Sequence, residues 1–356
     1  MTAQTPRALG YRMPAEWEPH EATWIAWPHN PEDWPGKFEP ISWIYADIVR
    51  CLSSVERVEI LVNDAAAEES AWKTLELTGV APDHVRFHRW PTDRVWTRDS
   101  GPIFVRRQDT GAIAATQWQF NAWAKYENWQ HDAEFPARAT SLLGIPAWQP
   151  QVRGQRVVLE GGSIDSNGQG VLLTTEECLL SEVQQRNPGL TRDDLDTCLQ
   201  EYLGIDKVIW LDRGIVGDDT HGHVDDISRF VAADTILTAI EPDPSDENHE
   251  ILAENIARLQ SATDQAGKPF RIVTLPMPDP VVFDGQRLPA SYANFYVANQ
   301  LVLVPTFSDA KDRIALETIA SLFQSRKVIG IPCRDFIWGL GALHCMTQQQ
   351  PASIVP

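Results

Sequence analysis

Apolar and polar residues along this 356-residue chain follow an order that repeats. Two runs rich in β-branched and apolar residues around a turn predict a β-hairpin, a stretch with helical periodicity follows, and a short apolar run then predicts a buried strand. Three full copies are expected. Their hairpins lie at 157–175, 226–240 and 294–307, their helices at 191–203, 247–262 and 309–325, and their strands at 207–212, 270–277 and 327–333.

The first part of the chain holds further pieces of the same unit. Residues 99–107 and 112–120 predict another hairpin with a short helix near 132–143, and a helix at 39–53 leads into a strand at 55–63. Hairpins start about every 67 residues, so the chain holds about five units, the first and last completing one another. The predicted fold class is α/β, with the units closed into a ring that exposes no sheet edge.

An open doubly wound α/β sheet is the structural alternative. It lacks its usual glycine-rich phosphate loop, because GGSIDSNGQG (161–170) lies inside a hairpin and not between a strand and a helix. No linker or low-complexity segment divides the chain, so residues 1–356 are expected to form one domain.

Charge and cysteine content narrow the class of protein. Thirty Lys and Arg against 49 Asp and Glu give a net charge of −19. This charge disfavours binding to nucleic acid and anionic membranes and attracts small cations. Neither a secretion signal nor a long apolar segment is seen, so a cytoplasmic protein is expected. The five cysteines form no C-x-x-C pair, which argues against a disulfide framework or a thiolate zinc site. The charge and the cysteine content are also compatible with a homo-oligomer.

Polar residues recur at nearly one point of each unit. Asp99 and Glu160 are 61 residues apart, Glu160 and His223 are 63 apart, and Cys345 follows His223 by 122, or two steps of 61. Asp225 stands beside His223. In a closed ring such residues converge on the central axis. The fourth unit should add Asp284, Tyr292 or Asn294, and the sequence does not choose among them.

This set suits one kind of chemistry. Carboxylates grip a planar guanidinium with charge-assisted hydrogen bonds. A thiolate is a strong nucleophile, and an imidazole passes protons to a leaving amine. Cys345 is therefore the candidate nucleophile, while Cys51, Cys178, Cys198 and Cys333 lie in apolar periodic segments and are expected to be structural.

A metal site is the competing hypothesis. The run THGHVDD comes within one residue of the T-H-x-H-x-D-H pattern of metallo-β-lactamase-like hydrolases, with His221, His223 and Asp225 as its ligands. Asp226 replaces the last histidine of that pattern, and only His249 and His344 remain downstream. A site without metal or other cofactor is therefore expected.

Seven motifs resemble those of the agmatine deiminase family, relatives of the bacterial peptidylarginine deiminases. They occur in order between residues 13 and 351 and read MPAEWEPHEATWIAWP, WTRDSGP, FNAW, EGGSID, GHVDD, SYANFY and HCMTQQQP. The resemblance implies a pentein fold, a five-bladed α/β propeller, and hydrolysis of agmatine to N-carbamoylputrescine and ammonia, a step towards putrescine and polyamines. It implies no cofactor.

The resemblance also implies a role for each motif residue. Cys345 corresponds to the nucleophile, His223 to the general acid and base, Asp99 and Asp225 to the pair that grips the guanidinium, and Glu160 to the carboxylate beside it. Trp96 is expected to stack on the guanidinium plane.

Departures from the family pattern affect the far end of the substrate. Family members usually read NGHVDN, AGGNIHC and FNAWGGK where this chain has HGHVDD, GLGALHC and FNAWAKY. Asp219 is the expected partner of the distal ammonium of agmatine, with Asp218 as its competitor. Deimination of free or peptidyl arginine remains an alternative, as does a non-catalytic binding protein for cationic amines.

Overall fold

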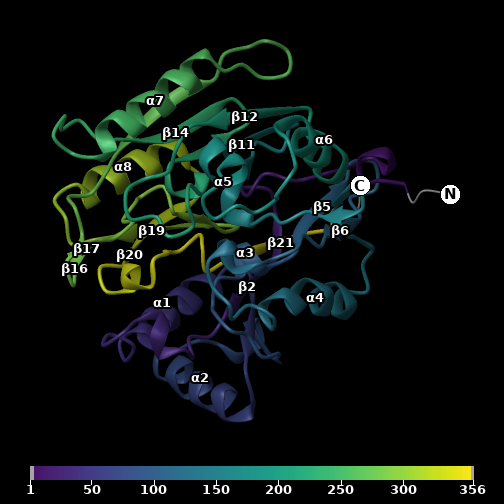
Figure 1. The fold of residues 1–356 in the computed structure, drawn as a ribbon. Helices are drawn as coiled ribbons and strands as arrows, with labels where there is room; N and C mark the ends of the chain where they lie inside the picture. The colour runs from purple at the N-terminus through teal and green to yellow at the C-terminus, as the bar shows by residue number, and fades with distance from the viewer. Residues whose placement is uncertain (1–3, 354–356) are drawn as a thin grey trace.

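The computed structural model describes residues 4–353 and contains five sheets built on one pattern (Figure 1). In each sheet a middle strand pairs antiparallel with one neighbour and parallel with the next. The α/β class and the repeated unit are therefore confirmed, and the single continuous sheet of the doubly wound alternative is not found among these residues.

Three sheets consist of one hairpin and one returning strand. Their strands are β10 (Asp165–Ser166), β11 (Val171–Thr175) and β12 (Lys207–Leu211); β13 (Ser228–Ala232), β14 (Thr235–Ile240) and β15 (Arg271–Pro276); and β18 (Tyr296–Val297), β19 (Leu301–Thr306) and β20 (Lys327–Pro332). Their helices are α6 (Arg192–Leu203), α7 (Asn248–Ser261) and α8 (Asp312–Leu322).

The other two sheets each contain an extra strand. One orders β1 (Tyr11–Arg12), β5 (Ile103–Arg107), β6 (Ile113–Thr116) and β7 (Ala147–Trp148), and the other orders β21 (Gln348–Pro351), β2 (His20–Ala26), β3 (Arg57–Val62) and β4 (Val85–Arg89). Because β21 comes from the end of the chain and β2 from its beginning, the first and last units do complete one another.

The long helices lie on the outside of the strands (Figure 1). Besides those named, they are α1 (Ile41–Leu52), α2 (Ala65–Leu77) and α4 (Phe135–Leu143). The short α5 (Glu176–Leu180) lies nearer the middle of the molecule (Figure 1). Local chemistry sets their ends: Thr191 and Asp194 form a reciprocal capping box at the start of α6, and Gly204 ends it with a left-handed φ of 65°. Such a cap is worth about 1 kcal/mol.

The hydrophobic pattern did not predict α2 or the strand β4 that follows it. Only Ala71 and Leu75 of α2 are buried, so its apolar stripe is too narrow to show in a periodicity search. The first strand expected from residue 157 is also displaced. Residues Gly161–Ser163 form a 3₁₀ turn, η6, and regular pairing begins only at Asp165.

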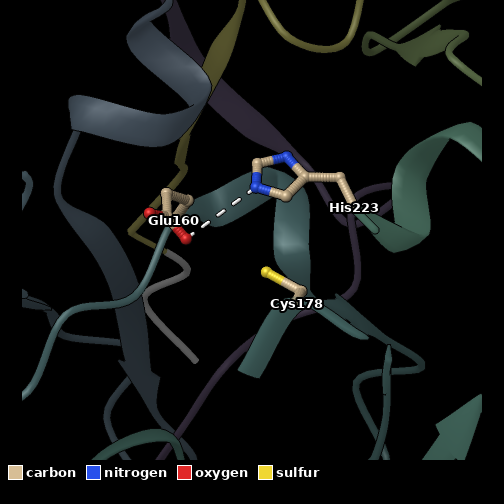
Figure 2. Close-up of side chains that lie close together, drawn as sticks. All are labelled: Glu160, Cys178 and His223. Atoms are coloured by element: carbon tan, nitrogen blue, oxygen red, sulfur yellow. Dashed lines mark ion pairs between the residues drawn. The ribbon is translucent and has the colours of Figure 1, made fainter. Parts of the chain in front are cut away.

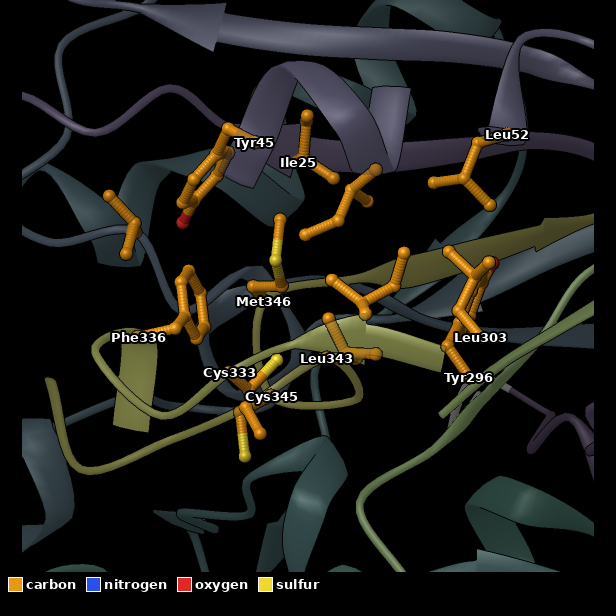
Figure 3. Packing of buried hydrophobic residues seen from close by; sticks show 14 of the residues in the cluster. Ile25, Tyr45, Leu52, Tyr296, Leu303, Cys333, Phe336, Leu343, Cys345 and Met346 are labelled. Carbon is orange, nitrogen blue, oxygen red and sulfur yellow. The ribbon is translucent and has the colours of Figure 1, made fainter. Parts of the chain in front are cut away.

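The central strands are buried along nearly their whole length. All residues of β11 and all but the last of β19 are inaccessible, as expected for strands covered on both faces. The largest apolar cluster joins α1, β19 and the segment before β21, and Figure 3 shows Leu343 and Met346 packed into it. This packing fixes the backbone on either side of Cys345. Among the residues described, no helix has the length and apolar character needed to cross a bilayer.

Candidate active site

The candidate residues lie on short turns at equivalent points of the units. Asp99 belongs to α3 (Thr97–Ser100), Glu160 precedes η6, and His223 caps the 3₁₀ turn η7 (Val224–Asp226), which contains Asp225. These turns contact one another, α3 against η6 and η6 against η7. Cys345 lies in the segment between the 3₁₀ turn η8 (Phe336–Gly339) and β21.

Hydrogen bonds connect most neighbouring units at this centre, including the last unit with the first. The Gly162 amide donates to Asp99 Oδ1 (3.0 Å), Asn294 Nδ2 donates to Asp226 Oδ1 (3.0 Å) and to Cys345 Sγ (3.1 Å), and the Arg98 amide donates to the carbonyl of Cys345 (3.2 Å). The residues far apart in sequence thus meet at one centre.

The fourth unit contributes Asn294, which settles the choice that the sequence left open. Tyr292 donates its hydroxyl to Asp312 (2.7 Å), away from Cys345. Asp284 lies in the turn between β16 (Val282–Phe283) and β17 (Gln286–Arg287).

Distances bring the candidate nucleophile, Cys345, and the imidazole of His223 into one site. The Cys345 thiol donates to Asp225 Oδ2 at 3.7 Å. A Cβ added to Gly162 would lie 3.0 Å from that same oxygen and 2.6 Å from His223 Nδ1. Because the three distances share end points, their sum is an upper limit, and Cys345 Sγ lies no farther than about 10 Å from the imidazole. One small planar cation can bridge that distance.

His223 is held between carboxylates. Its Nδ1 lies 3.8 Å from Asp99 Oδ1 and its Nε2 lies 3.8 Å from Glu160 Oε2. All three side chains are buried. Glycine is required at 162 because a Cβ there would also lie 2.8 Å from Asp99 Oδ1.

Glu160 has an internal cation of its own. Arg186 Nε donates to Glu160 Oε1 at 2.9 Å, and neither side chain is exposed. Glu160 is therefore already charge-balanced before any substrate binds, while its Oε2 has no hydrogen-bond partner among the described residues. Arg186 was not identified from the sequence.

Two further residues near the centre were missed. Cys178 on α5 was expected to be structural, yet its sulfur lies with His223 and Glu160, and all three side-chain ends point toward one another (Figure 2). Trp123 donates its indole N–H to Asp99 Oδ2 at 3.0 Å. Neither contact has a signature in spacing or composition.

His344 connects the N-terminal segment to the site. Its Nδ1 lies 2.7 Å from Asp225 Oδ2 and its Nε2 lies 2.7 Å from Glu16 Oε2. His344 thus bridges two buried carboxyl groups, one on the N-terminal segment and one in the site. His344 therefore fixes the orientation of Asp225 from behind.

A cavity of about 650 Å³ opens onto this centre, and Cys345 and Asp99 lie at its inner end. Trp96 and Trp123 line it, and the ring of Trp96 lies so close to Gly341 that a Cβ there would approach it to 2.7 Å. The placement of Trp96 fits the predicted stacking on a planar cation.

The mouth of the cavity is acidic. Glu32, Asp33, Glu127 and Asp219 line it together with one cation, Arg94, which is paired with Asp33 at 2.8 Å. Asp218 does not line the cavity, because its carboxylate accepts from the backbone amides of 220, 222 and 223 and holds that loop. Asp219 does line it, but it already contacts Lys125 and the hydroxyl of Tyr126.

Comparison with known proteins agrees with this arrangement. The sequence model of the family described as Porphyromonas-type peptidyl-arginine deiminase matches residues 12–351. The chain belongs to this family. An agmatine deiminase of Stutzerimonas stutzeri is 36% identical over 99% of this chain and 98% of its own, and one of Ectopseudomonas mendocina is 34% identical over 98% and 97%.

Solved structures of such deiminases have the same fold. The agmatine deiminase of Enterococcus faecalis superposes with a TM-score of 0.91 at 30% identity over 99% of both chains. A putative arginine deiminase of Porphyromonas gingivalis gives 0.85 at 32% identity over 97% of this chain and 100% of its own. The pentein fold expected for this family member is thereby confirmed.

Burial and the neighbouring charges together set the resting charges of the thiol and the imidazole in this family member. Burial, and then the charges of Asp225, Asp226 and Asp99, raise the pKa of the Cys345 thiol well above its usual value. Burial alone lowers the pKa of His223, but the charge of Asp99 and the nearness of Cys178 and Glu160 outweigh it and raise the pKa well above 6.5. The resting pair is a neutral thiol and an imidazolium.

The pKa values of the three carboxyl groups in the site differ from one another. Burial raises the pKa of Asp99 to about 6, against the opposing charge of His223. Burial would also raise the pKa of Asp225, but its contact with His344 outweighs this and lowers the pKa below 3.8. For Glu160 the charge of Arg186 overcomes burial, and the pKa is lowered to about 2. Asp225 and Glu160 are thus ionised at neutral pH, while Asp99 titrates just below it.

The ligands named by the competing metal hypothesis do not assemble among the described residues. His221 turns away, with Nε2 3.1 Å from Ser181 Oγ, so His221, His223 and Asp225 do not form a cluster. Within residues 4–353 the one group of three donors close enough for a metal ion is Glu160, Cys178 and His223.

Proposed function

We propose that this chain is an agmatine deiminase, which hydrolyses agmatine to N-carbamoylputrescine and ammonia. The observation that carries the proposal is a buried thiol, hydrogen-bonded to Asp225, at the inner end of an acidic cavity lined by tryptophans. The full-length likeness to agmatine deiminases supports the same reaction class, a hydrolase of C–N bonds in linear amidines.

Binding places the guanidinium between Asp99 and Asp225, with its plane against Trp96. The resting thiol is neutral because burial, and then the charges of three nearby carboxyl groups, raise its pKa. A bound cation supplies the positive charge that favours the thiolate, so the thiol proton leaves to solvent when the substrate arrives. The substrate thereby activates its own nucleophile.

The first half of the reaction forms a covalent intermediate. Cys345 Sγ adds to the guanidinium carbon, the C–N bond to a terminal amino group breaks, and the His223 imidazolium donates its proton to the departing ammonia. An amidino thioether that keeps the alkyl chain remains on Cys345. Asp99 and Asp225 stay ionised and hold the planar group so that its carbon faces the sulfur.

The second half releases the product. His223, now neutral, removes a proton from water, and the hydroxide oxygen adds to the amidino carbon. The C–S bond then breaks to return the thiolate, and the hydroxyl group loses its remaining proton to solvent as the carbonyl forms. The product carries a ureido group, and no oxidant, metal or cofactor is needed. Glu160 and Arg186 position His223 in both halves.

The mouth of the cavity favours agmatine over arginine. Its carboxylates outnumber the single lining cation, Arg94, which is already paired, so an ammonium is better matched than a carboxylate. We propose Asp219 as the partner of the distal ammonium, in competition with Lys125. We further propose that residues 1–356 act as one cytoplasmic domain whose charge of −19 keeps it from nucleic acid and membranes.

A substrate panel tests this function. Ammonia release should be fastest with agmatine and slow with arginine or peptidyl arginine. Citrulline from arginine, with no ammonia from agmatine, would overturn the substrate assignment but keep the chemistry. No ammonia from any guanidine would support the non-catalytic binding protein instead.

A further inference from the structure

We propose that Glu160, Cys178 and His223 form a binding site for zinc or a similar thiophilic divalent cation, and that occupation of this site blocks the deiminase. The inference rests on the proposed function only for its inhibitory consequence. The binding itself follows from side chains that the reaction leaves partly unused.

The donor set is one that zinc accepts. One thiol sulfur, one imidazole nitrogen and one carboxylate oxygen lie within 4.8 Å of one another, and Figure 2 shows the three side chains converging. Zinc binds S, N and O donors at about 2.3, 2.0 and 2.1 Å in a tetrahedron, which separates the donors by about 3.5 Å. His223 Nε2 and Glu160 Oε2 are 3.8 Å apart, close to this separation, and the sulfur, at up to 4.8 Å from the others, would approach by about 1 Å.

The donor atoms are also free to bind. Glu160 Oε2 and both ring nitrogens of His223 are buried and have no hydrogen-bond partner among the described residues. Buried polar atoms without partners are uncommon, and an ion between them supplies the missing contact. Three protein donors leave a fourth tetrahedral position for water.

Charges balance when the ion enters. Binding releases the thiol proton of Cys178 and one proton from the His223 imidazolium, and both leave to solvent. The resulting thiolate and the Glu160 carboxylate carry the two negative charges that a divalent cation needs, and the charge of Arg186 is then offset by Asp99, whose Oδ1 lies 3.8 Å from His223 Nδ1. Arg186 is still held by Glu160 Oε1, which the ion does not use.

A route and a consequence follow from the position of the site. Asp99 lines the acidic cavity and its Oδ1 lies 3.8 Å from His223 Nδ1, so a cation held by Asp99 is next to the imidazole of the proposed site. Once bound through Nε2, His223 can no longer exchange the proton that the reaction requires. Thiophilic ions should therefore inhibit, whereas Mg²⁺, which prefers oxygen donors, should not.

Cadmium binding tests the site without reference to activity. Reduced Cys345→Ala protein, which lacks the proposed nucleophile, is titrated with CdCl₂ and the thiolate-to-cadmium absorbance in the ultraviolet is recorded. One equivalent should bind. The signal should disappear when Cys178→Ser is added and persist when Cys198→Ala, a change at another buried thiol, is added instead.

Zinc inhibition provides the second readout. In protein that keeps Cys345, the rate with zinc is measured relative to each variant's own metal-free rate. Cys178→Ser should raise the zinc concentration that gives half-inhibition at least roughly tenfold. Glu160→Gln, which keeps the side-chain shape, should weaken cadmium binding to a similar degree, with circular dichroism checking the fold of each variant.

Two outcomes would overturn the proposal: absence of cadmium–thiolate absorbance in Cys345→Ala, or its persistence after Cys178→Ser is added. Because cadmium binding is read directly, failure of the site is distinguishable from failure of the agmatine assignment.

Discussion

Replacing Trp123 with phenylalanine tests whether Asp99 must be ionised for activity. The indole N–H of Trp123 donates to Asp99 Oδ2 at 3.0 Å in a buried setting and stabilises the carboxylate form. A hydrogen bond to a charged group contributes about 1.5–3 kcal/mol. At about 1.4 kcal/mol per pKa unit, its loss should raise the pKa of Asp99 by about 1–2 units from its value of about 6.

The sign of the effect on rate follows directly. Only ionised Asp99 binds the guanidinium, so the free enzyme loses kcat/KM as pH falls through that pKa. With the pKa near 6, half of Asp99 is ionised at pH 6; with the pKa at about 7–8, about 1–9% is ionised. The variant should be roughly 5- to 50-fold slower than wild type at pH 6 and should approach it near pH 8.5.

The assay is ammonia release from agmatine at low substrate concentration across that pH range. Trp118→Phe is the matched control, because the Trp118 indole is also buried but donates to a neutral acceptor, Thr116 Oγ1, at 2.8 Å. In Trp118→Phe, the fall of kcat/KM at acidic pH should occur at the same pH as in wild type. No shift of this fall in Trp123→Phe, or an equal shift in both variants, would refute the role given to Asp99.

Further substitutions probe the other parts of the site. Gly162→Ala should lower kcat for ammonia release about 100-fold, because the new Cβ would lie 2.6 Å from His223 Nδ1 and displace the ring; activity within twofold of wild type would contradict this. His344→Asn breaks two 2.7 Å contacts and frees Asp225, so kcat/KM for agmatine should fall at least roughly tenfold, and an unchanged value would remove its positioning role. Asp219→Asn should raise the KM for agmatine up to about fivefold without lowering the rate with arginine, and equal effects on both substrates would argue against a contact to the distal ammonium.

Repetition explains why so much of the fold was accessible from the sequence. The hairpin, helix and strand recur with a regular pitch, and the N-terminal and C-terminal pieces fit together as β2 and β21. Regular spacing then predicted that Asp99, Glu160 and His223 lie on equivalent turns. This argument depends on chain geometry alone and needs no knowledge of side-chain direction.

Side-chain direction is what the sequence could not provide. Cys178 lies in an apolar run, and only the path of the five-residue helix α5 turns its sulfur toward His223. Glu16 and His344 are 328 residues apart and meet because the termini close the last sheet. The pairing of Glu160 Oε1 with Arg186 likewise depends on side-chain direction and has no signature in the sequence.

The covalent intermediate on Cys345 gives the most direct test of the account. The enzyme is mixed with agmatine, quenched in acid during turnover, and measured by intact-protein and peptide mass spectrometry. The account predicts a transient adduct of agmatine less ammonia on the peptide that contains Cys345, and neither adduct nor turnover in Cys345→Ser. Steady ammonia release by Cys345→Ser, or an adduct on another residue, would contradict it.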